Sequence, residues 1–349
     1  MVYISLPEEK DRPLAFYLAM EEYVARHLDV EHGFFMWQTE PSVIFGRNQL
    51  IENEVNREYC RLNGIGMFRR KSGGGCVYSD KGNVMMSYVT KDENVHLAFN
   101  RYVGMVVLAL RKLGVEANAT GRNDILIDGR KVSGSAFYHL PGHSIVHGTL
   151  LFDTNMKHMV GSITPTGEKL ASKGVESVRQ HIALLKDHVD LSVDGLMSFV
   201  RELLCDSRLT LTAKDVEAIE RLMEEEYLAD DFIYGKNPRC SVTRRRRIEG
   251  VGDLELRMQL KNGIIKDVHL LGDFFLLGDL NELLSRLRGV PLESEAVWRA
   301  LPERVDDVVR NLRKADLTSL LVGAPLSSPL GGKTQRTDNL SPLGGRKGP

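Results

Sequence analysis

The alternation of apolar and polar positions divides the first half of the chain into short extended segments and one long amphipathic segment. Apolar runs at 33–37 and 43–46 are bounded by turn residues, which is typical of β-strands. At 97–113 apolar residues recur every three to four positions, which predicts a helix. The pair Asp128-Gly129 lies between two extended segments and predicts a hairpin with a type I′ turn, followed by a strand at 145–153.

The second half of the chain shows two kinds of pattern separated by a polar interruption. Helical spacing at 194–205 and 213–227 predicts two helices, the second with an acidic outer face. The polar segment 235–238 and the four arginines at 244–247 break the pattern and are interpreted as a crossing between domains. A small α+β module is expected beyond it, with strands at 254–260 and 264–271, a turn at Asn262-Gly263, and helices at 279–287 and 293–321.

The length of 349 residues exceeds what one compact core usually holds, so more than one domain is expected. The last segment has no aromatic residue and repeats Ser-Pro-Leu-Gly-Gly at 328–332 and 341–345. Such a composition buries too little apolar surface to offset the entropy of ordering, which predicts a disordered tail. We therefore expect a large domain at 1–237, a small domain at 238–322 and a tail at 323–349.

Composition narrows the class of protein. The chain has 46 basic and 47 acidic residues, a formal net charge of -1, which argues against a nucleic-acid binder that relies on overall positive charge. The longest nearly apolar run, 104–110, is far shorter than the roughly 20 residues of a membrane helix, and the N-terminus lacks signal-peptide features. Four widely spaced cysteines without a C-x-x-C pair favour reduced thiols, and we expect a cytoplasmic protein.

The strongest chemical signal is the segment Arg-Arg-Lys-Ser-Gly-Gly-Gly-Cys-Val-Tyr-Ser-Asp at 69–80. Three consecutive glycines let backbone amides approach an anion closely, and Arg69, Arg70 and Lys71 add positive charge beside them. The spacing matches neither a Walker A loop nor a dinucleotide fingerprint. A glycine-rich turn with a solvated basic flank is the alternative.

A second cluster of polar residues surrounds the predicted hairpin, in Gly-Arg-Asn-Asp at 121–124 and Arg-Lys-Val-Ser-Gly-Ser-Ala at 130–136. Lys131 follows the turn and could meet a phosphate or carboxylate beside the serines. Asp124 could hold Mg²⁺ next to substrate phosphates. The alternatives are an exposed hairpin lysine and an aspartate that caps a turn.

Five blocks together resemble, in the same order, the signature motifs of lipoate-protein ligases. The region after Tyr234 is similar to the small accessory domain of the bacterial-type enzymes. Two positions depart from the family pattern, since Cys76 replaces the usual alanine and Ser79 replaces the usual histidine. The five blocks are Arg-Arg-x-Ser-Gly-Gly-Gly-x-Val-Tyr-x-Asp-x-Gly-Asn at 69–83, Gly-Arg-Asn-Asp at 121–124, Arg-Lys-Val-Ser-Gly-Ser-Ala at 130–136, His-Gly-Thr-Leu-Leu at 147–151 and Ser-Lys-Gly-Val-Glu-Ser-Val-Arg at 172–179.

The resemblance implies an α+β protein: an α/β catalytic domain of the biotin/lipoate ligase type at 1–237, and a small α+β accessory domain at 238–322. It implies two half-reactions, in which lipoate (or octanoate) and ATP, with Mg²⁺, form lipoyl-AMP, and an acceptor lysine then takes the acyl group. The implied acceptors are lipoyl domains of 2-oxoacid dehydrogenase E2 subunits and the glycine-cleavage H protein. Neither nucleic acid nor a membrane is an expected partner.

The resemblance also implies a set of site residues. Lys131 is the expected catalytic residue, bridging the lipoyl carbonyl and the α-phosphate, and Asp124 is the candidate for Mg²⁺. The implied ATP and lipoyl-AMP contacts are Arg70, Ser72, Gly73, Gly74, Gly75, Cys76, Val77, Tyr78, Asn83, Asp124 and Lys131, and the implied acyl contacts are Gly73, Gly74, Lys131, Ser135, His147 and Gly148.

Three other interpretations stay open from the sequence. A related octanoyltransferase would need a nucleophilic cysteine after its lysine, but none lies between Val77 and Leu204, and Cys205 and Cys240 are expected to be structural. The others are a non-catalytic, ligase-like lipoate-binding or regulatory protein and a nucleic-acid module. The nucleic-acid interpretation rests on the four arginines at 244–247. We favour a different role for them, in which their positive charge steers an acidic lipoyl domain toward the site.

Three histidines share a spacing of four residues, at positions 139, 143 and 147. On a helix this spacing could form a metal-binding face. Pro141-Gly142 would break such a helix, so we expect no structural metal and place His147 on a strand.

Overall fold

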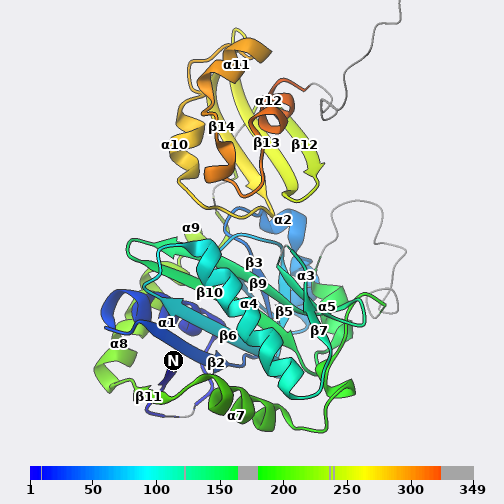
Figure 1. The fold of residues 1–349 in the computed structure, drawn as a ribbon. Helices are drawn as coiled ribbons and strands as arrows, with labels where there is room; N and C mark the ends of the chain where they lie inside the picture. The colour runs from blue at the N-terminus through cyan, green and yellow to red at the C-terminus, as the bar shows by residue number, and fades with distance from the viewer. Residues whose placement is uncertain (9, 122, 164–179, 236, 239, 324–349) are drawn as a thin grey trace, which may run out of the picture.

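The computed structural model describes residues 1–8, 10–121, 123–163, 180–235, 237–238 and 240–323. Its largest element is an eight-stranded mixed sheet with the order β11-β1-β2-β6-β10-β9-β8-β7 (Figure 1). The first three strands of this order run parallel, and the others pair antiparallel. The strands are β1 (Val2–Ser5), β2 (His32–Trp37), β6 (Asn83–Thr90), β7 (Ala117–Ala119), β8 (Asp124–Ile127), β9 (Arg130–Leu140), β10 (His143–Leu151) and β11 (Ser207–Thr210).

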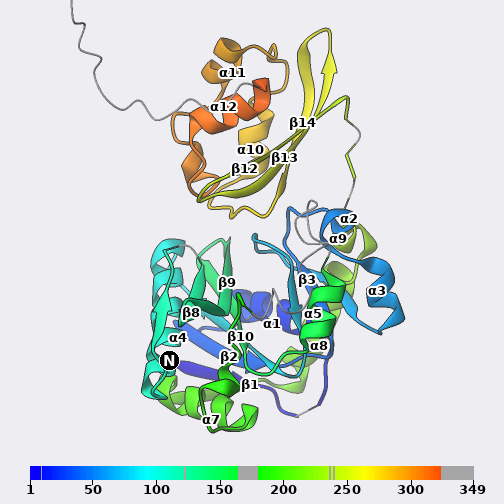
Figure 2. The same cartoon turned by 90° about the vertical axis from the view of Figure 1, so that its right-hand side faces the viewer.

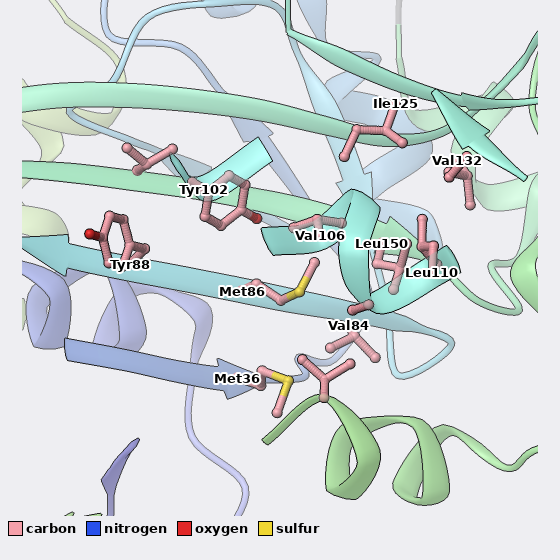
Figure 3. Packing of buried hydrophobic residues seen from close by; sticks show 14 of the residues in the cluster. Met36, Val84, Met86, Tyr88, Tyr102, Val106, Leu110, Ile125, Val132 and Leu150 are labelled. Carbon is pink, nitrogen blue, oxygen red and sulfur yellow. The ribbon is translucent and has the colours of Figure 1, made fainter. Parts of the chain in front are cut away.

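Helices cover both faces of this sheet, and the central strand β6 is buried along its whole length. Val84 and Met86 of β6 pack with Tyr102 of α4 (Val95–Lys112), as Figure 3 shows. Met85 and Val89 belong instead to the core formed with α1 (Leu14–His27). This alternation follows from the two-residue period of a strand. Helix α7 (Val193–Leu204) adds to the α4 side and α8 (Ala213–Leu222), continued by a π-helical turn (Met223–Tyr227), adds to the α1 side.

A second, three-stranded sheet with the order β4-β3-β5 packs against the large sheet through its central strand. Ile44 of β3 packs into the core under α1, whereas Val43 and Phe45 point into a separate small core. Strand β3 therefore joins the two cores. The elements of this region are β3 (Ser42–Phe45), β4 (Gly66–Arg69), β5 (Val77–Ser79), α2 (Ile51–Glu54), α3 (Arg57–Leu62), α5 (Met156–Ser162) and α9 (Asp230–Ile233).

The C-terminal part forms an antiparallel sheet, β12-β13-β14, with its helices on one side (Figure 2). Leu254 and Leu256 of β13 face the helices in an apolar core. Glu255, between them, faces the rest of the protein and accepts a hydrogen bond from Asn53 Nδ2 at 3.4 Å. The elements are β12 (Val242–Ile248), β13 (Gly252–Lys261), β14 (Ile264–Gly272), α10 (Leu280–Ser285), α11 (Ser294–Ala300) and α12 (Lys314–Val322).

The arginine run at 244–247 is not a domain crossing, and that prediction is wrong. The run lies in β12 and pairs residue by residue with β13. Its first and third arginines donate hydrogen bonds to the end of α12, to backbone carbonyls and to Ser319 Oγ. Its second and fourth arginines form ion pairs with Glu255 and Asp253. Each arginine thus has an intramolecular partner, and the run stabilises an edge strand.

The segment 293–321 also differs from its prediction, because it is not one helix. Helix α11 ends just before Pro302, and Asn311 has a positive φ of 64° that no helix allows. The turn at 128–129 is confirmed, with φ values of 49° and 76°.

Some predictions lie outside the described residues. They concern the block at 172–179 and the tail beyond Gly323. Among the described helices, none is both long and apolar enough to cross a bilayer.

Candidate active site

A pocket opens between the large sheet and the three-stranded sheet. Its volume is about 620 Å³, including the space at its open mouth. The lining comes from both sheets, from α1 and from the C-terminal domain. The lining residues are Leu18, Trp37, Ile44, Arg70, Gly74, Gly75, Cys76, Val77, Met85, Asn123, Lys131, Gly134, Ser135, Ala136, His147, Gly148, Thr149 and Phe275.

The floor of this pocket follows one row of paired residues across the large sheet. Trp37 pairs with Met85, Met85 with Thr149, Thr149 with Gly134, and Gly134 with Asp124. Four interstrand spacings correspond to about 19 Å. One end of the row is aromatic and apolar, and the other end carries a carboxylate. The pocket itself therefore changes from apolar at Trp37 to charged at Lys131, whose ammonium group pairs with that carboxylate.

Lys131 lies at the charged end and its position is fixed from two sides. Its backbone N–H donates to the His181 carbonyl at 2.9 Å, and its carbonyl accepts from Ala183 N–H at 2.8 Å. Its Nζ forms an ion pair of 2.8 Å with Asp124. A Cβ at Gly134 would come within 2.8 Å of the same Nζ, so this glycine leaves the room in which the lysine lies.

Arg70 lies beneath the glycine loop, where its guanidinium binds the loop itself. Nε donates to Ser72 Oγ at 3.0 Å, and Nη2 donates to the carbonyls of Gly73 and Gly75 at 2.7 Å each. Burial lowers the pKa of Arg70 to about 10, so the side chain stays charged at neutral pH. Most of the N–H donors of Arg70 therefore stabilise the conformation of the loop, and few are left to bind a ligand.

The two flanking cations of the loop do not line the pocket. Arg69 donates to the carbonyls of Gly46 and Gln49, which fixes the chain after β3. Lys71 forms an ion pair with Glu22 at 2.6 Å and another with Glu226. Of the three cations expected to charge the glycine loop, only Arg70 reaches the pocket.

The C-terminal domain completes one wall of the pocket. Gly74 N–H donates to the Phe274 carbonyl at 3.2 Å, and a Cβ at Gly73 would overlap that carbonyl oxygen. The Phe275 ring stacks on Phe137 with centroids 5.4 Å apart and lines the pocket. Here glycine is required because another backbone approaches closely. Sequence reasoning missed Phe275, since nothing in its local pattern separates it from a core phenylalanine.

The structure brings most of the predicted site residues to the pocket but not all of them. Ser72 and Gly73 lie behind the loop, and Asp124 reaches the site through Lys131. Tyr78 packs into the small core, and Asn83 is fully buried with its amide donating to Thr154 Oγ1 at 3.1 Å. The predicted residues that line the pocket are Arg70, Gly74, Gly75, Cys76, Val77, Lys131, Ser135, His147 and Gly148.

The two departures from the family pattern have different surroundings. Cys76 lines the pocket, and burial raises the pKa of its thiol well above the ordinary range. Ser79 is fully buried, and its hydroxyl has no hydrogen-bond partner within the described residues.

The comparison with protein families decides what this pocket belongs to. Residues 13–204, more than half of the chain, match the lipoyl protein ligase A/B catalytic domain. The chain belongs to the lipoate-protein ligase family. Residues 237–321 match the bacterial lipoate protein ligase C-terminus, so the ligase has both parts of the bacterial enzyme type. Membership makes this chain an ATP-dependent ligase, and the predicted family and fold class are confirmed.

Individual relatives cover between 67% and 87% of this chain. Lipoate-protein ligase LplJ of Bacillus subtilis is 35% identical over 316 residues, which are 87% of this chain and 95% of the relative. A bi-partite lipoate protein ligase of Thermoplasma acidophilum, described with its E2 lipoyl domain, has a TM-score of 0.61 and 27% identity over 69% of this chain and 98% of its own. A lipoate-protein ligase A bound with ATP has a TM-score of 0.58 and 25% identity, and the match covers 67% of this chain and 98% of that chain.

Proposed function

We propose that the pocket activates lipoate, or the related acid octanoate, as an acyl adenylate and then transfers the acyl group to a lysine of a lipoyl domain. The observation that carries this proposal is the polarity of the pocket floor, from Trp37 at one end to Asp124 and Lys131 at the other. A carboxylic acid with a long apolar chain has the same polarity. Its chain fits the aromatic end, and its carboxylate comes to the ammonium group.

In the first half-reaction a carboxylate oxygen of the acid attacks the α-phosphorus of ATP. The bond to pyrophosphate breaks, and the products are acyl-AMP and pyrophosphate. Negative charge gathers on the phosphoryl oxygens. Arg70 is bound to the carbonyls of the glycine loop, so Lys131 is the lining cation whose ammonium group can stabilise this charge. The chain supplies position and charge here and needs no protein nucleophile.

In the second half-reaction the neutral amine of the acceptor lysine attacks the acyl carbon. The bond to AMP breaks, AMP leaves with the electron pair, and the amine releases its proton. Lys131 lies where it can donate to the carbonyl oxygen as that oxygen gains charge. The same side chain therefore serves both steps.

Mg²⁺ enters this proposal as a companion of ATP. Asp124 is a carboxylate at the charged end of the pocket, and Mg²⁺ is usually bound by one or two carboxylates together with substrate phosphates. The described residues contain no cluster of three or more acidic, histidine or cysteine side chains that would form a dedicated cage. Asp124 would hold the ion, which would neutralise phosphate charge.

The acceptors that we propose are lipoyl domains of 2-oxoacid dehydrogenase E2 subunits and the glycine-cleavage H protein. The archaeal relative is described with its E2 lipoyl domain, which supports the first of these. Because ATP is an intracellular substrate, we propose a cytoplasmic location.

The alternative of a cysteine-dependent octanoyltransferase loses support at Cys76. This is the cysteine that lines the pocket, and its raised pKa keeps the thiol protonated and weakly nucleophilic. Cys205 lies at the end of α7, where burial raises its pKa to about 11.

The test is a reconstitution with the full chain, ATP, Mg²⁺, lipoate and an apo lipoyl domain, followed by intact mass of the acceptor. We expect the lipoyl mass increase only when every component is present. Modification of the acceptor from octanoyl acyl carrier protein without ATP would overturn the proposal in favour of the transferase. No modification with either donor would favour a binding protein without catalysis.

A further inference from the structure

A buried chain of hydrogen bonds begins at the aromatic end of the pocket. Trp37 Nε1–H donates to Ser87 Oγ at 3.0 Å, and Ser87 O–H donates to Glu21 Oε1 at 2.6 Å. These residues come from β2, β6 and α1. Ser87 and Glu21 have no exposed surface, so water cannot replace either partner.

The chain continues to the glycine loop. His147 Nδ1 lies 2.8 Å from Glu21 Oε2, and His147 Nε2 lies 2.7 Å from Ser72 Oγ. Arg70 Nε–H donates to the same Ser72 oxygen at 3.0 Å. A carboxylate only accepts, so Nδ1 carries a proton, and Nε2 can then accept from the Ser72 hydroxyl. Each donor in this order has an acceptor.

We call this chain the relay; it consists of Trp37, Ser87, Glu21, His147, Ser72 and Arg70. Both of its ends line the pocket, and His147 lines it in the middle. Arg70 in turn holds the carbonyls of Gly73 and Gly75. A shift of the aromatic wall is therefore connected to the shape of the glycine loop by buried hydrogen bonds, which are strong where water is excluded.

The serine, histidine and acid within the relay resemble the order of a hydrolase triad, but the geometry excludes a nucleophile. Ser72 has no exposed surface and does not line the pocket. Its oxygen already accepts from Arg70. An attacking oxygen needs an open approach and a free lone pair.

We propose that the relay couples the Trp37 end of the pocket to the glycine loop, so that the acid and the nucleotide bind with positive cooperativity. This rests on the proposed function, in which the acid occupies the Trp37 end and ATP lies at the glycine loop. Glu21 is a positioning residue: it orients His147 and so Ser72 and Arg70. An acid that seats against Trp37 selects the loop arrangement that binds the nucleotide, and the reverse holds by linkage.

The experiment measures the dissociation constant of lipoate on the full chain with and without α,β-methylene-ATP, which cannot release pyrophosphate. In the wild type we expect the analogue to tighten lipoate binding by about fivefold or more. Ser87→Ala and Glu21→Gln should each bring this factor close to one. Ser144→Ala is the matched control, because Ser144 is equally buried but its hydroxyl has no hydrogen-bond partner in the described chain. It should keep the wild-type factor.

The outcomes separate the two proposals. If the wild type fails to bind lipoate, or fails to bind the nucleotide analogue, the proposed function is wrong. If both bind but independently, or if Ser87→Ala and Glu21→Gln keep the wild-type factor, the relay is overturned. Should one of these variants fail to fold, the other decides, and Trp37→Phe, which removes the indole N–H and also makes the side chain smaller, should likewise bring the factor close to one.

Discussion

Lys131 Nζ lies 2.8 Å from the carboxylate of Asp124, and the β8–β9 pairing together with the 181–183 segment fixes both residues at the charged end of the pocket. Asp124 is thus the residue that directs the ammonium group along the sheet. Because Gly134 has no side chain, the lysine can lie across the floor toward the pocket.

Asp124→Asn should lower the rate of acyl-adenylate formation. The amide keeps the size of the side chain but removes the charge that orients Lys131, and misplacement of a reacting group by about 1 Å can cost about 100-fold. Pyrophosphate release with lipoate and ATP measures the effect. Asp128→Asn is the matched control, because Asp128 lies exposed in the same hairpin with a positive φ that asparagine tolerates. Equal rates in the two variants would remove Asp124 from the mechanism.

Phe275→Ala should raise the Michaelis constants for lipoate and ATP, because it opens a pocket wall that the C-terminal domain supplies. Loss of a buried phenylalanine also costs about 3–5 kcal/mol of stability. Phe99→Ala separates the two effects, since Phe99 packs on the same Phe137 ring at 5.5 Å but does not line the pocket. If both variants change the Michaelis constants equally, the wall is not specific to Phe275.

Cys76→Ala should keep ATP-dependent lipoylation, because the thiol is protonated and its raised pKa comes first from burial. Alanine also occupies less space in the pocket, so no overlap is created. The measurement is acceptor modification by intact mass with lipoate and ATP. Complete loss of acceptor modification in a folded variant would show that Cys76 takes part in the reaction.

Glu54→Gln should stabilise the protein at pH 8 but not near pH 4.5. Burial, with smaller contributions from Asp273 and Asp253 of the C-terminal domain, raises the pKa of Glu54 to about 7. An unfolded glutamate has a pKa of about 4.3. The folded state therefore holds the proton more tightly, and wild-type stability falls as the pH rises from about 4.3 through 7. Thermal unfolding at the two pH values measures this.

Glu52→Gln is the control for this pH dependence, because Glu52 is exposed on the same helix. It should change the melting temperature little at either pH. A gain for Glu54→Gln that is the same at both pH values would contradict the role of ionisation.

The sequence predicts the helices and turns that show a clear pattern within a short segment. It does not predict features that depend on contacts between residues far apart in the chain. The helix at 97–113 agrees with the structure because its buried and exposed faces give a visible periodicity of apolar residues. The turn at 128–129 agrees because Asp-Gly is a residue pair that tolerates positive φ. Helix α1 was missed, since it is buried on most sides and shows no clear amphipathic period. The arginine run interrupts the apolar pattern and so predicts a crossing between domains, because the partners of its side chains lie in β13 and α12, far away in the sequence.

The same reason explains the site. The glycine loop and Lys131 lie in compact motifs and could be found from the sequence. Glu21 stands in α1 next to Glu22 and looks like one of two surface acids, although it is fully buried against His147. Its role, like that of Trp37, exists only after β2, β6 and β10 have paired.

The most direct test of the central claim is formation of lipoyl-AMP by Lys131→Ala, measured by mass spectrometry with ATP, Mg²⁺ and lipoate in the absence of an acceptor. Lys186→Ala, which removes an exposed lysine paired with Asp153, is the control and should form the intermediate like the wild type. We predict that a folded Lys131→Ala protein forms no detectable lipoyl-AMP. Formation at the wild-type rate would contradict the assignment of Lys131 and with it the mechanism proposed for this pocket.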